Sequence, residues 1–315
     1  MRHTLRASVS NVHVGFYDCS LAPVLRVKSE DLVEVFTVSG RLELYDLLDV
    51  RDKLPKELEE IRREKGPGGH ILHGPIYVED ATPNDTLEVT LLEIEPWLSF
   101  GTNIFWSGKG SIPEDFPYQR IKCIPIDPEK KFGILSDRLK VPLKPFFGQL
   151  GVAPAPFPGK VAGHAPGVHG GNLDNKELVA SSKVYFPIFN EGALFSIGDG
   201  HASQGDGEVD QSALEICMKG LIKLRVIKGV RTKWPMAETE NSFILMGFGV
   251  TLDEAFKMAL RNAIDFLERK GVNRDDAYML CSLSVDFHIT QTVNETKGVH
   301  ALIPKVLFKD KQAMP

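Results

Sequence analysis

The clearest pattern along the chain is an alternation of apolar and polar residues at a period of two. In Thr86–Ile94, Leu87, Val89 and Leu91 alternate with polar residues, which is typical of a strand with one face buried. Two further segments rich in Val, Leu or Ile also predict strands: Asp31–Val38 and Leu221–Ile227.

The middle and the end of the chain continue this pattern. Lys183–Phe189 and Ala193–Ile197 are predicted strands on either side of the turn Asn190-Glu191-Gly192, so the middle third favours an antiparallel sheet. Ser284–Val293 and His300–Leu307 predict two closing strands.

Few segments have helical periodicity. In Thr251–Lys270 the apolar residues recur at spacings of three and four. Thr251 and Glu254 have the spacing of a capping box, and Gly271 follows as a C-terminal cap. Two shorter helices are predicted, a surface helix over Pro55–Lys65 closed by Gly66 and one that starts near Asp275.

Residues 142–166 are rich in proline and glycine. Such a composition suits neither a helix nor a central strand, so we expect an irregular segment or an internal boundary within one domain over 1–315. Together, these elements predict a mainly β fold with a β-sandwich or jelly-roll-like core, a few helices and α+β additions.

Composition and charge argue against nucleic-acid-binding and membrane proteins. With 42 Asp+Glu against 37 Lys+Arg, the net charge of −5 gives no reason to expect nucleic acid or an anionic membrane surface as partner. The N-terminus has no continuous apolar region, and the apolar stretch near Phe243–Val250 is interrupted by glycine. We therefore expect a cytoplasmic protein that does not enter a membrane.

Candidate chemistry is concentrated in residues 159–208, which hold ten of the 28 glycines. This window carries Gly-Gly-Asn-Leu-Asp at 170–174 and Gly-Asp-Gly-His-Ala-Ser-Gln-Gly-Asp-Gly-Glu at 198–208. Because glycine permits unusual turns, we expect five titratable residues in loops beside strand ends: Asp174, Asp199, His201, Asp206 and Glu208.

Oxygen and imidazole groups gathered in this way suit zinc or a similar divalent ion. Asp199 and His201 have the strand spacing that puts both side chains on one face, and Glu208 can return to the same point through the turn before it. Such a site leaves coordination positions for water and substrate, and a carboxylate beside it can act as a base.

A simpler interpretation is a pair of Asx turns, with His201 on a surface loop. The metal hypothesis is more specific, because so many carboxylates packed together would repel one another without a cation. His70 and His73, three residues apart in a glycine-rich segment, could line a pocket, but we favour loop histidines with solvent partners.

The chain resembles the acetamidase/formamidase family of amide hydrolases, and the resemblance rests on several blocks. They are Gly74-Pro75-Ile76-Tyr77-Val78-Glu79, Pro83–Val89, Pro145-Phe146-Phe147-Gly148, Gly151–Pro154, Gly170–Asp174 and above all Gly192–Phe195 leading into Gly198–Glu208. Residues 40–65 and 97–140 match none of these motifs, and such inserts could control substrate preference.

The resemblance implies a largely β, oligomeric enzyme that hydrolyses short amides such as formamide or acetamide with a divalent metal, usually zinc. Its metal ligands would be Asp174, Asp199 and His201, with Glu208 as a further candidate ligand, and the resemblance leaves open which carboxylate is ligand and which is base. We choose Glu208 as the catalytic base and assign Asn172 to substrate binding. The expected partners are thus a small amide substrate and further copies of the chain.

Two alternatives stay open. One is hydrolysis of a cyclic amide, a lactam, and the other is a non-catalytic β-sandwich module that holds structural Ca²⁺. An imidazole ligand favours Zn²⁺, whereas Ca²⁺ prefers oxygen ligands alone.

Overall fold

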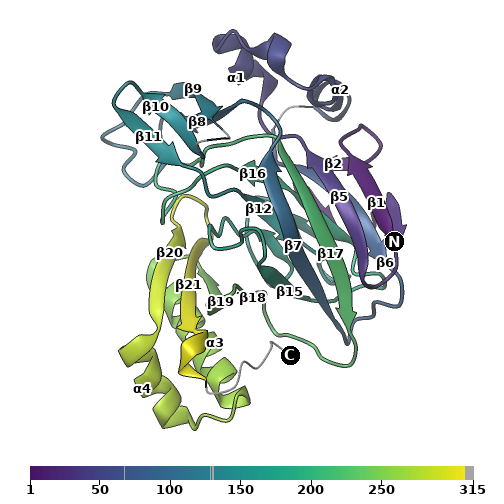
Figure 1. The fold of residues 1–315 in the computed structure, drawn as a ribbon, viewed down its shortest axis with the longest axis vertical. Helices are drawn as coiled ribbons and strands as arrows, with labels where there is room; N and C mark the ends of the chain where they lie inside the picture. Colours follow the sequence, from purple (N-terminus) through teal and green to yellow (C-terminus); the bar gives the residue numbers. More distant parts are fainter. Residues whose placement is uncertain (67, 128, 130, 309–315) are drawn as a thin grey trace.

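The computed structural model describes residues 1–66, 68–127, 129 and 131–308. Its largest sheet has nine strands in the order β1-β5-β17-β7-β15-β18-β19-β21-β20 (Figure 1). Their bounds are β1 Arg2–Arg6, β5 Asp31–Thr37, β17 Met218–Ile227, β7 Thr86–Pro96, β15 Lys183–Pro187, β18 Met236–Glu238, β19 Ser242–Gly249, β21 Lys297–Pro304 and β20 Asp286–Gln291. Apart from the parallel pair β1 and β5, neighbouring strands in this order are antiparallel.

A second sheet has six strands, and two smaller sheets complete the fold. The second sheet contains, in order, β14 Gly170–Asn172, β12 Phe146–Gly151, β16 Phe195–His201, β6 Ile71–Val78 and β2 Val12–Val14, with β4 Leu25–Val27 beside β6. The four-stranded sheet contains β11 Leu139–Pro142, β10 Phe132–Ser136, β9 Arg120–Asp127 and β8 Phe100–Phe105, and β13 Lys160–Ala162 pairs with β3 Phe16–Asp18.

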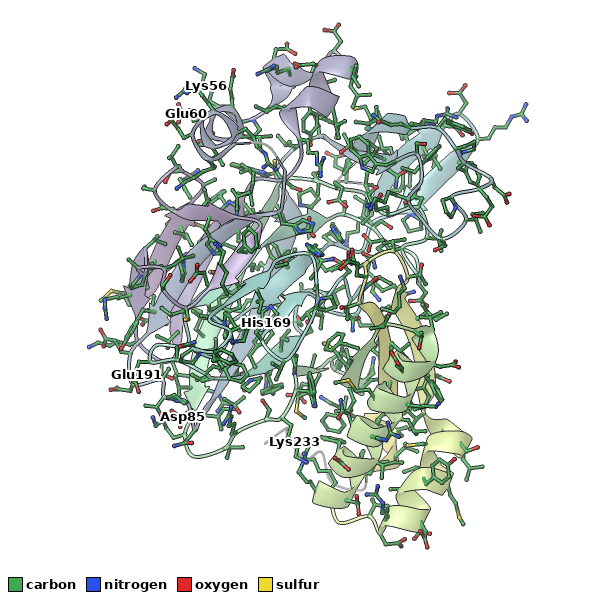
Figure 2. The ribbon with its side chains drawn as sticks, turned by 180° about the vertical axis from the view of Figure 1, so that it is seen from behind. Lys56, Glu60, Asp85, His169, Glu191 and Lys233 are labelled. Carbon is green, nitrogen blue, oxygen red and sulfur yellow. The ribbon has the colours of Figure 1, made fainter. Side chains whose placement is uncertain are left out.

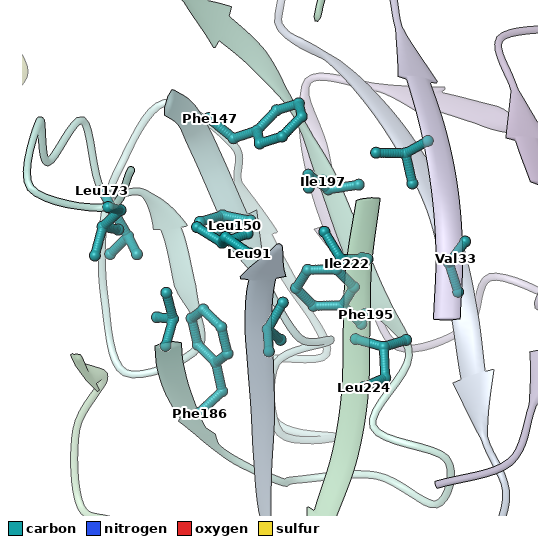
Figure 3. Packing of buried hydrophobic residues seen from close by; sticks show 14 of the residues in the cluster. Val33, Leu91, Phe147, Leu150, Leu173, Phe186, Phe195, Ile197, Ile222 and Leu224 are labelled. Carbon is teal, nitrogen blue, oxygen red and sulfur yellow. The ribbon is translucent and has the colours of Figure 1, made fainter. Parts of the chain in front are cut away.

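The main core lies between the two large sheets. Val33 and Ile222 of the nine-stranded sheet belong to the same buried cluster as Leu150 and Ile197 of the six-stranded sheet (Figure 3). Each fully buried side chain of this kind stabilises the fold by about 1.5 to 3 kcal/mol. The mainly β class with a few helices, as predicted, is confirmed.

Strand β12 corrects the interpretation of residues 142–166 as irregular. Phe146–Gly151 is buried throughout and pairs with both β14 and β16, so a central strand does occur here. The prolines at 142, 145 and 154 lie outside the strand. They therefore remove no hydrogen bond from its ladder.

Strand β7 is also more buried than its pattern predicts. All residues from Thr86 to Leu91 are buried, polar positions included. The polar positions have partners, because Glu88 forms an ion pair with Arg225 and the Thr86 hydroxyl donates to a backbone carbonyl. Alternation thus marks the two faces of this strand, but both faces are covered.

The two strands expected beside the turn at 190–192 do not pair with each other. β15 joins the nine-stranded sheet, whereas β16 joins the six-stranded sheet. Ala193 and Leu194 both have left-handed backbone, with φ of 59° and 54°. These consecutive residues turn the chain from one sheet to the other.

Helices cover two regions. α3 (Leu252–Arg269) and α4 (Arg274–Ser284) lie beside the strands at the end of the chain, and the predicted capping box of α3 is present (Figure 1). α1 (Leu42–Leu47) and α2 (Lys56–Lys65), joined through a 3₁₀ turn at Arg51–Lys53, lie at the opposite end near the four-stranded sheet. A second 3₁₀ turn spans Lys305–Leu307.

The predicted helix over Pro55–Lys65 matches α2, whose Lys56 and Glu60 point away from the sheets (Figure 2). Among the helices of the described residues, none combines the length and apolar character needed to cross a membrane.

Candidate functional site

The predicted site residues come together from three parts of the chain. Asp199 and His201 lie within β16, so their assignment to loops is wrong, whereas Asp174 follows β14 and Glu208 lies between β16 and β17. All four are buried, with exposed fractions of at most 6%. Asp206, which the sequence grouped with them, instead bonds to His288 and Lys176.

Three of the acidic residues have unusual backbone. Asp174, Asp199 and Glu208 have φ of 43°, 57° and 45°, in the left-handed region that residues with a Cβ rarely adopt. Such conformations cost on the order of 1 kcal/mol each and cluster at functional sites.

The cluster has the spacing of a metal site. His201 Nε2 lies 3.4 Å from Asp199 Oδ2 and 3.4 Å from Glu215 Oε1. Four ligands around zinc at about 2.1 Å would be separated by about 3.4 Å. Two sets of groups lie close enough to hold an ion: Asp174, Asp199 and His201, and His201, Glu208 and Glu215.

Glu215 is the residue that the sequence analysis missed. It precedes β17 and forms isolated bridges with His201 and Thr102. The available signal was a single carboxylate in the apolar stretch Ala213–Met218, but its proximity to His201 depends on tertiary structure.

Gly148 of β12 leaves the space in which the cluster sits. A Cβ built on this residue would lie 2.6 Å from Asp174 Oδ1, 2.8 Å from Asp199 Oδ2 and 2.8 Å from His201 Cε1. Only glycine lets the strand backbone approach so closely.

Gln204 fixes the orientation of His201. Its Nε2 donates to the carbonyl oxygens of Asp174, at 2.6 Å, and Thr290, at 3.4 Å. Its Oε1 must therefore accept the hydrogen bond from His201 Nδ1, at 3.0 Å. The lone pair of neutral His201 consequently lies on Nε2, which faces the carboxylates, as in histidines that bind metals.

The two carboxylate oxygens of Asp174 differ: Oδ2 accepts a hydrogen bond, and Oδ1 has no hydrogen-bond partner. Asn172 Nδ2 donates to Asp174 Oδ2, and Gln149 Nε2 donates in turn to Asn172 Oδ1. Oδ1 of Asp174 is buried without a hydrogen-bond partner, which is costly unless a cation lies beside it. Asn172 lines the cavity described below, and its assignment to substrate binding stays a prediction.

Two carboxylates of the cluster, Asp174 and Glu208, lack compensating positive charge. Burial, opposed by His201 and reinforced by Asp199, raises the pKa of Asp174 well above 3.8. Burial and the Asp174 charge likewise raise the pKa of Glu208 well above 4.5. Burial opposes charging of His201, but Glu215 and Asp199 raise its pKa well above 6.5. A divalent cation would relieve this repulsion.

His70 and His73 have different environments. His70 Nε2 lies 3.6 Å from Asp199 Oδ2, and His70 Nδ1 bonds to Gln149 Nε2 at 3.0 Å, so its interpretation as a solvent-facing histidine is wrong. His73 is fully buried and accepts from the Val38 amide. Burial lowers the pKa of His73 to about 3, and its role is structural.

A cavity of about 320 Å³ opens onto the cluster, and Asp174, Asp199, His201, Glu208 and Glu215 form one part of its wall. Other parts of the wall come from α1, α2 and β8, through side chains such as Tyr45, Arg62 and Ile104. A second cavity of about 290 Å³ shares Glu208 and Ser212 with the first. The site can therefore bring a small molecule against a buried group of carboxylates and an imidazole.

Known proteins share this fold and part of this sequence. Residues 161–310 match the model of the Acetamidase/Formamidase family. A formamidase of Methylophilus methylotrophus is 31% identical over 168 residues, which cover 46% of this chain and 41% of the relative. An acetamidase of Mycolicibacterium smegmatis is 32% identical over 146 residues, covering 38% of this chain and 35% of that protein.

A crystal structure of an acetamidase from Bacillus halodurans matches over nearly the whole chain. It covers 98% of this chain and 100% of its own, with a TM-score of 0.84 and 29% identity. The family model covers the segment that carries Asp174, Asp199, His201 and Glu208, and the structural match extends to both ends of the fold. Residues 161–310 thus resemble the acetamidase/formamidase family in sequence, the whole chain resembles an acetamidase in fold, and the sequence matches span less than half the length of the curated relatives.

Proposed function

We propose that this protein hydrolyses short-chain amides such as formamide and acetamide to the carboxylic acid and ammonia, with Zn²⁺ as the divalent metal ion. The observation that carries the proposal is the buried cluster in which Asp174 Oδ1 has no partner and Gln204 aims His201 Nε2 at carboxylates. The names of the formamidase and acetamidase relatives support the reaction class.

Asp174, Asp199 and His201 would hold the metal. When bound, such an ion polarises an amide carbonyl and lowers the pKa of water to about 7. Glu208 stays outside this set and faces the cavity. We assign it the proton transfers: its carboxylate takes a proton from the attacking water and delivers it to the amide nitrogen. A C–O bond forms, the C–N bond breaks, and the nitrogen leaves as ammonia.

The residues fit zinc better than calcium. Ca²⁺ takes six to eight oxygen ligands, whereas this cluster includes an imidazole in a fixed tautomer. The calcium-binding module without catalysis is therefore the less favoured alternative, and metal analysis of the purified protein distinguishes the two.

The direct test is ammonia release from formamide, acetamide and a lactam, with and without a chelator. We expect release from the linear amides that a chelator abolishes and Zn²⁺ restores. Turnover that persists in a protein shown to be free of metal would refute the metal-dependent mechanism.

Glu208→Gln tests the base. We expect the variant to keep its metal and to lose about 10² to 10⁴-fold in kcat, the contribution of a positioned acid or base. The matched control is Glu191→Gln on the exposed surface (Figure 2), which should retain full turnover. A Glu208→Gln variant with an unimpaired rate would exclude this role.

Further copies of the chain as partners and a cytoplasmic location stay predictions. Gel filtration with light scattering tests the first.

A further inference from the structure

The cavity is larger than the simplest amides need. Acetamide has four non-hydrogen atoms, whereas pockets of about 300 to 1,000 Å³ hold ligands of drug size. The cavity of about 320 Å³ lies at the lower end of this range. Space is therefore left beside an amide group placed at the cluster.

Apolar side chains also line this cavity. Leu44 and Tyr45 of α1, Ile104 of β8 and the following Trp106 all contribute to its wall. They come from the two segments that match none of the family motifs in the sequence. An apolar substituent on the amide would find contacts here.

Arg41, immediately before α1, adds a positive charge to the same wall. Its guanidinium lies over the Trp106 ring, 5.3 Å from the centroid, and its side chain is exposed. Among the described residues, no carboxylate forms an ion pair with it. Arg62, by contrast, donates to the carbonyl oxygens of Gly40, Gly68 and Gly69. Its guanidinium therefore stabilises the backbone of these loops.

Building on the proposed amide hydrolysis, we propose that Arg41 and Trp106 form a subsite for a carboxylate on the substrate. The substrate class is an amide whose apolar or aromatic middle part contacts Leu44 and Ile104 and whose far end is anionic. The planar guanidinium suits a carboxylate because it can donate two parallel hydrogen bonds. The cation–π contact with Trp106 favours this position of the guanidinium.

The charges in the cavity also set the direction of binding. Four carboxylates, Asp174, Asp199, Glu208 and Glu215, line the same cavity as Arg41. An anionic group is repelled from the carboxylates that a metal does not neutralise and attracted to the guanidinium. The neutral amide end therefore enters toward the cluster.

The experiment compares kcat/KM for acetamide, phenylacetamide and 4-carboxyphenylacetamide. We expect the wild type to prefer the carboxylated substrate over phenylacetamide by about tenfold, the scale of one charge-assisted hydrogen-bond pair. Arg41→Gln should abolish this preference and leave acetamide turnover unchanged. Trp106→Ala should lower kcat/KM for both aryl substrates, again without effect on acetamide.

Lys56→Gln, an exposed cation on α2 (Figure 2), is the matched control and should keep the preference. A wild type without the preference, or an Arg41→Gln variant that retains it, would overturn the subsite. If no amide releases ammonia, the proposed function fails, and calorimetric binding of 4-carboxyphenylacetamide then decides the subsite separately. Binding that weakens about tenfold in Arg41→Gln supports it, and equal or undetectable binding in both proteins refutes it.

Discussion

The buried carboxylate of Glu238 and the buried carboxylates around His201 have opposite surroundings. Glu238 of β18 is 5% exposed, and it accepts hydrogen bonds from Lys305 Nζ and the Tyr185 hydroxyl, each at 2.7 Å. Lys183 adds a second positive charge at 3.4 Å. Although burial opposes ionisation, these partners lower the pKa of Glu238 below 4.5.

In the cluster around His201, despite burial, the histidines lower the pKa of Asp199, but Asp174 and Glu208 lack such compensation. Burial and neighbouring carboxylates raise the pKa values of Asp174 and Glu208, and Asp174 Oδ1 has no hydrogen-bond partner among the described residues. The chain thus neutralises Glu238 with its own lysines but places no lysine beside Asp174 or Glu208 among the described residues. We infer that the missing charge comes from a bound cation.

The largest effect should follow from filling the space beside the cluster. Gly148→Ala places a methyl group within 3 Å of two carboxylate oxygens and of His201 Cε1. We expect amide turnover to fall by at least about 10³-fold and metal content to fall with it, because displacement of about 1 Å already disrupts a preorganised site.

The control is Gly205→Ala. A Cβ on Gly205 meets no atom within 4 Å, so this variant should keep both metal and turnover. Steady-state kinetics and elemental analysis check both variants. Full metal occupancy with normal turnover in Gly148→Ala would show that the ion is not bound at this cluster.

A smaller effect, on metal affinity, is expected when His201 loses its hydrogen bond to Gln204. Gln204→Leu removes the acceptor of the His201 Nδ1 hydrogen bond, and loss of such a partner weakens metal binding by about 10 to 100-fold. Competition with a chelating dye measures the affinity. The exposed Gln119 supplies the control, since Gln119→Leu should bind metal as the wild type does. Unchanged affinity in Gln204→Leu would assign the residue a purely structural role.

The smallest effect concerns the compensated carboxylate. The folded-state pKa of Glu238 lies below its unfolded value, so its ionised form stabilises the fold above about pH 4.3, and this contribution is lost as pH falls. We expect Glu238→Gln to lower the free energy of unfolding by about 1 to 2 kcal/mol at pH 7. Urea unfolding of variant and wild type should give a difference that shrinks between pH 5 and pH 3. A difference independent of pH would contradict ion pairing as its source.

Sequence patterns predicted the parts of the fold in which local rules and tertiary structure agree. Helix α3 follows its periodicity, its capping box and its closing glycine almost to the residue. The string from Gly198 to Glu208 likewise identified three members of the cluster, because glycine and acidic residues that alternate around a histidine have few structural explanations.

The remainder of the site could not be predicted, since it depends on distant contacts. Glu215 and His70 reach the cluster from the approach to β17 and the start of β6, and neither has a neighbouring motif. Strand β12 could not be predicted from composition, because the prolines that argue against a strand lie on either side of it and not within it. The position of Gly148 beside the cluster therefore could not be predicted.

The two hydrogen bonds that Gln204 Nε2 donates connect distant parts of the chain. Its amide group joins Asp174 to Thr290 of β20, so the orientation of His201 depends on a strand that the ribosome makes near the end of synthesis. A nascent chain that stops before residue 290 already contains every proposed ligand. It lacks the Thr290 carbonyl oxygen, which helps to orient Gln204 and, through it, the His201 imidazole. If the proposed metal ion binds here, its tight binding would therefore follow translation of the final hairpin.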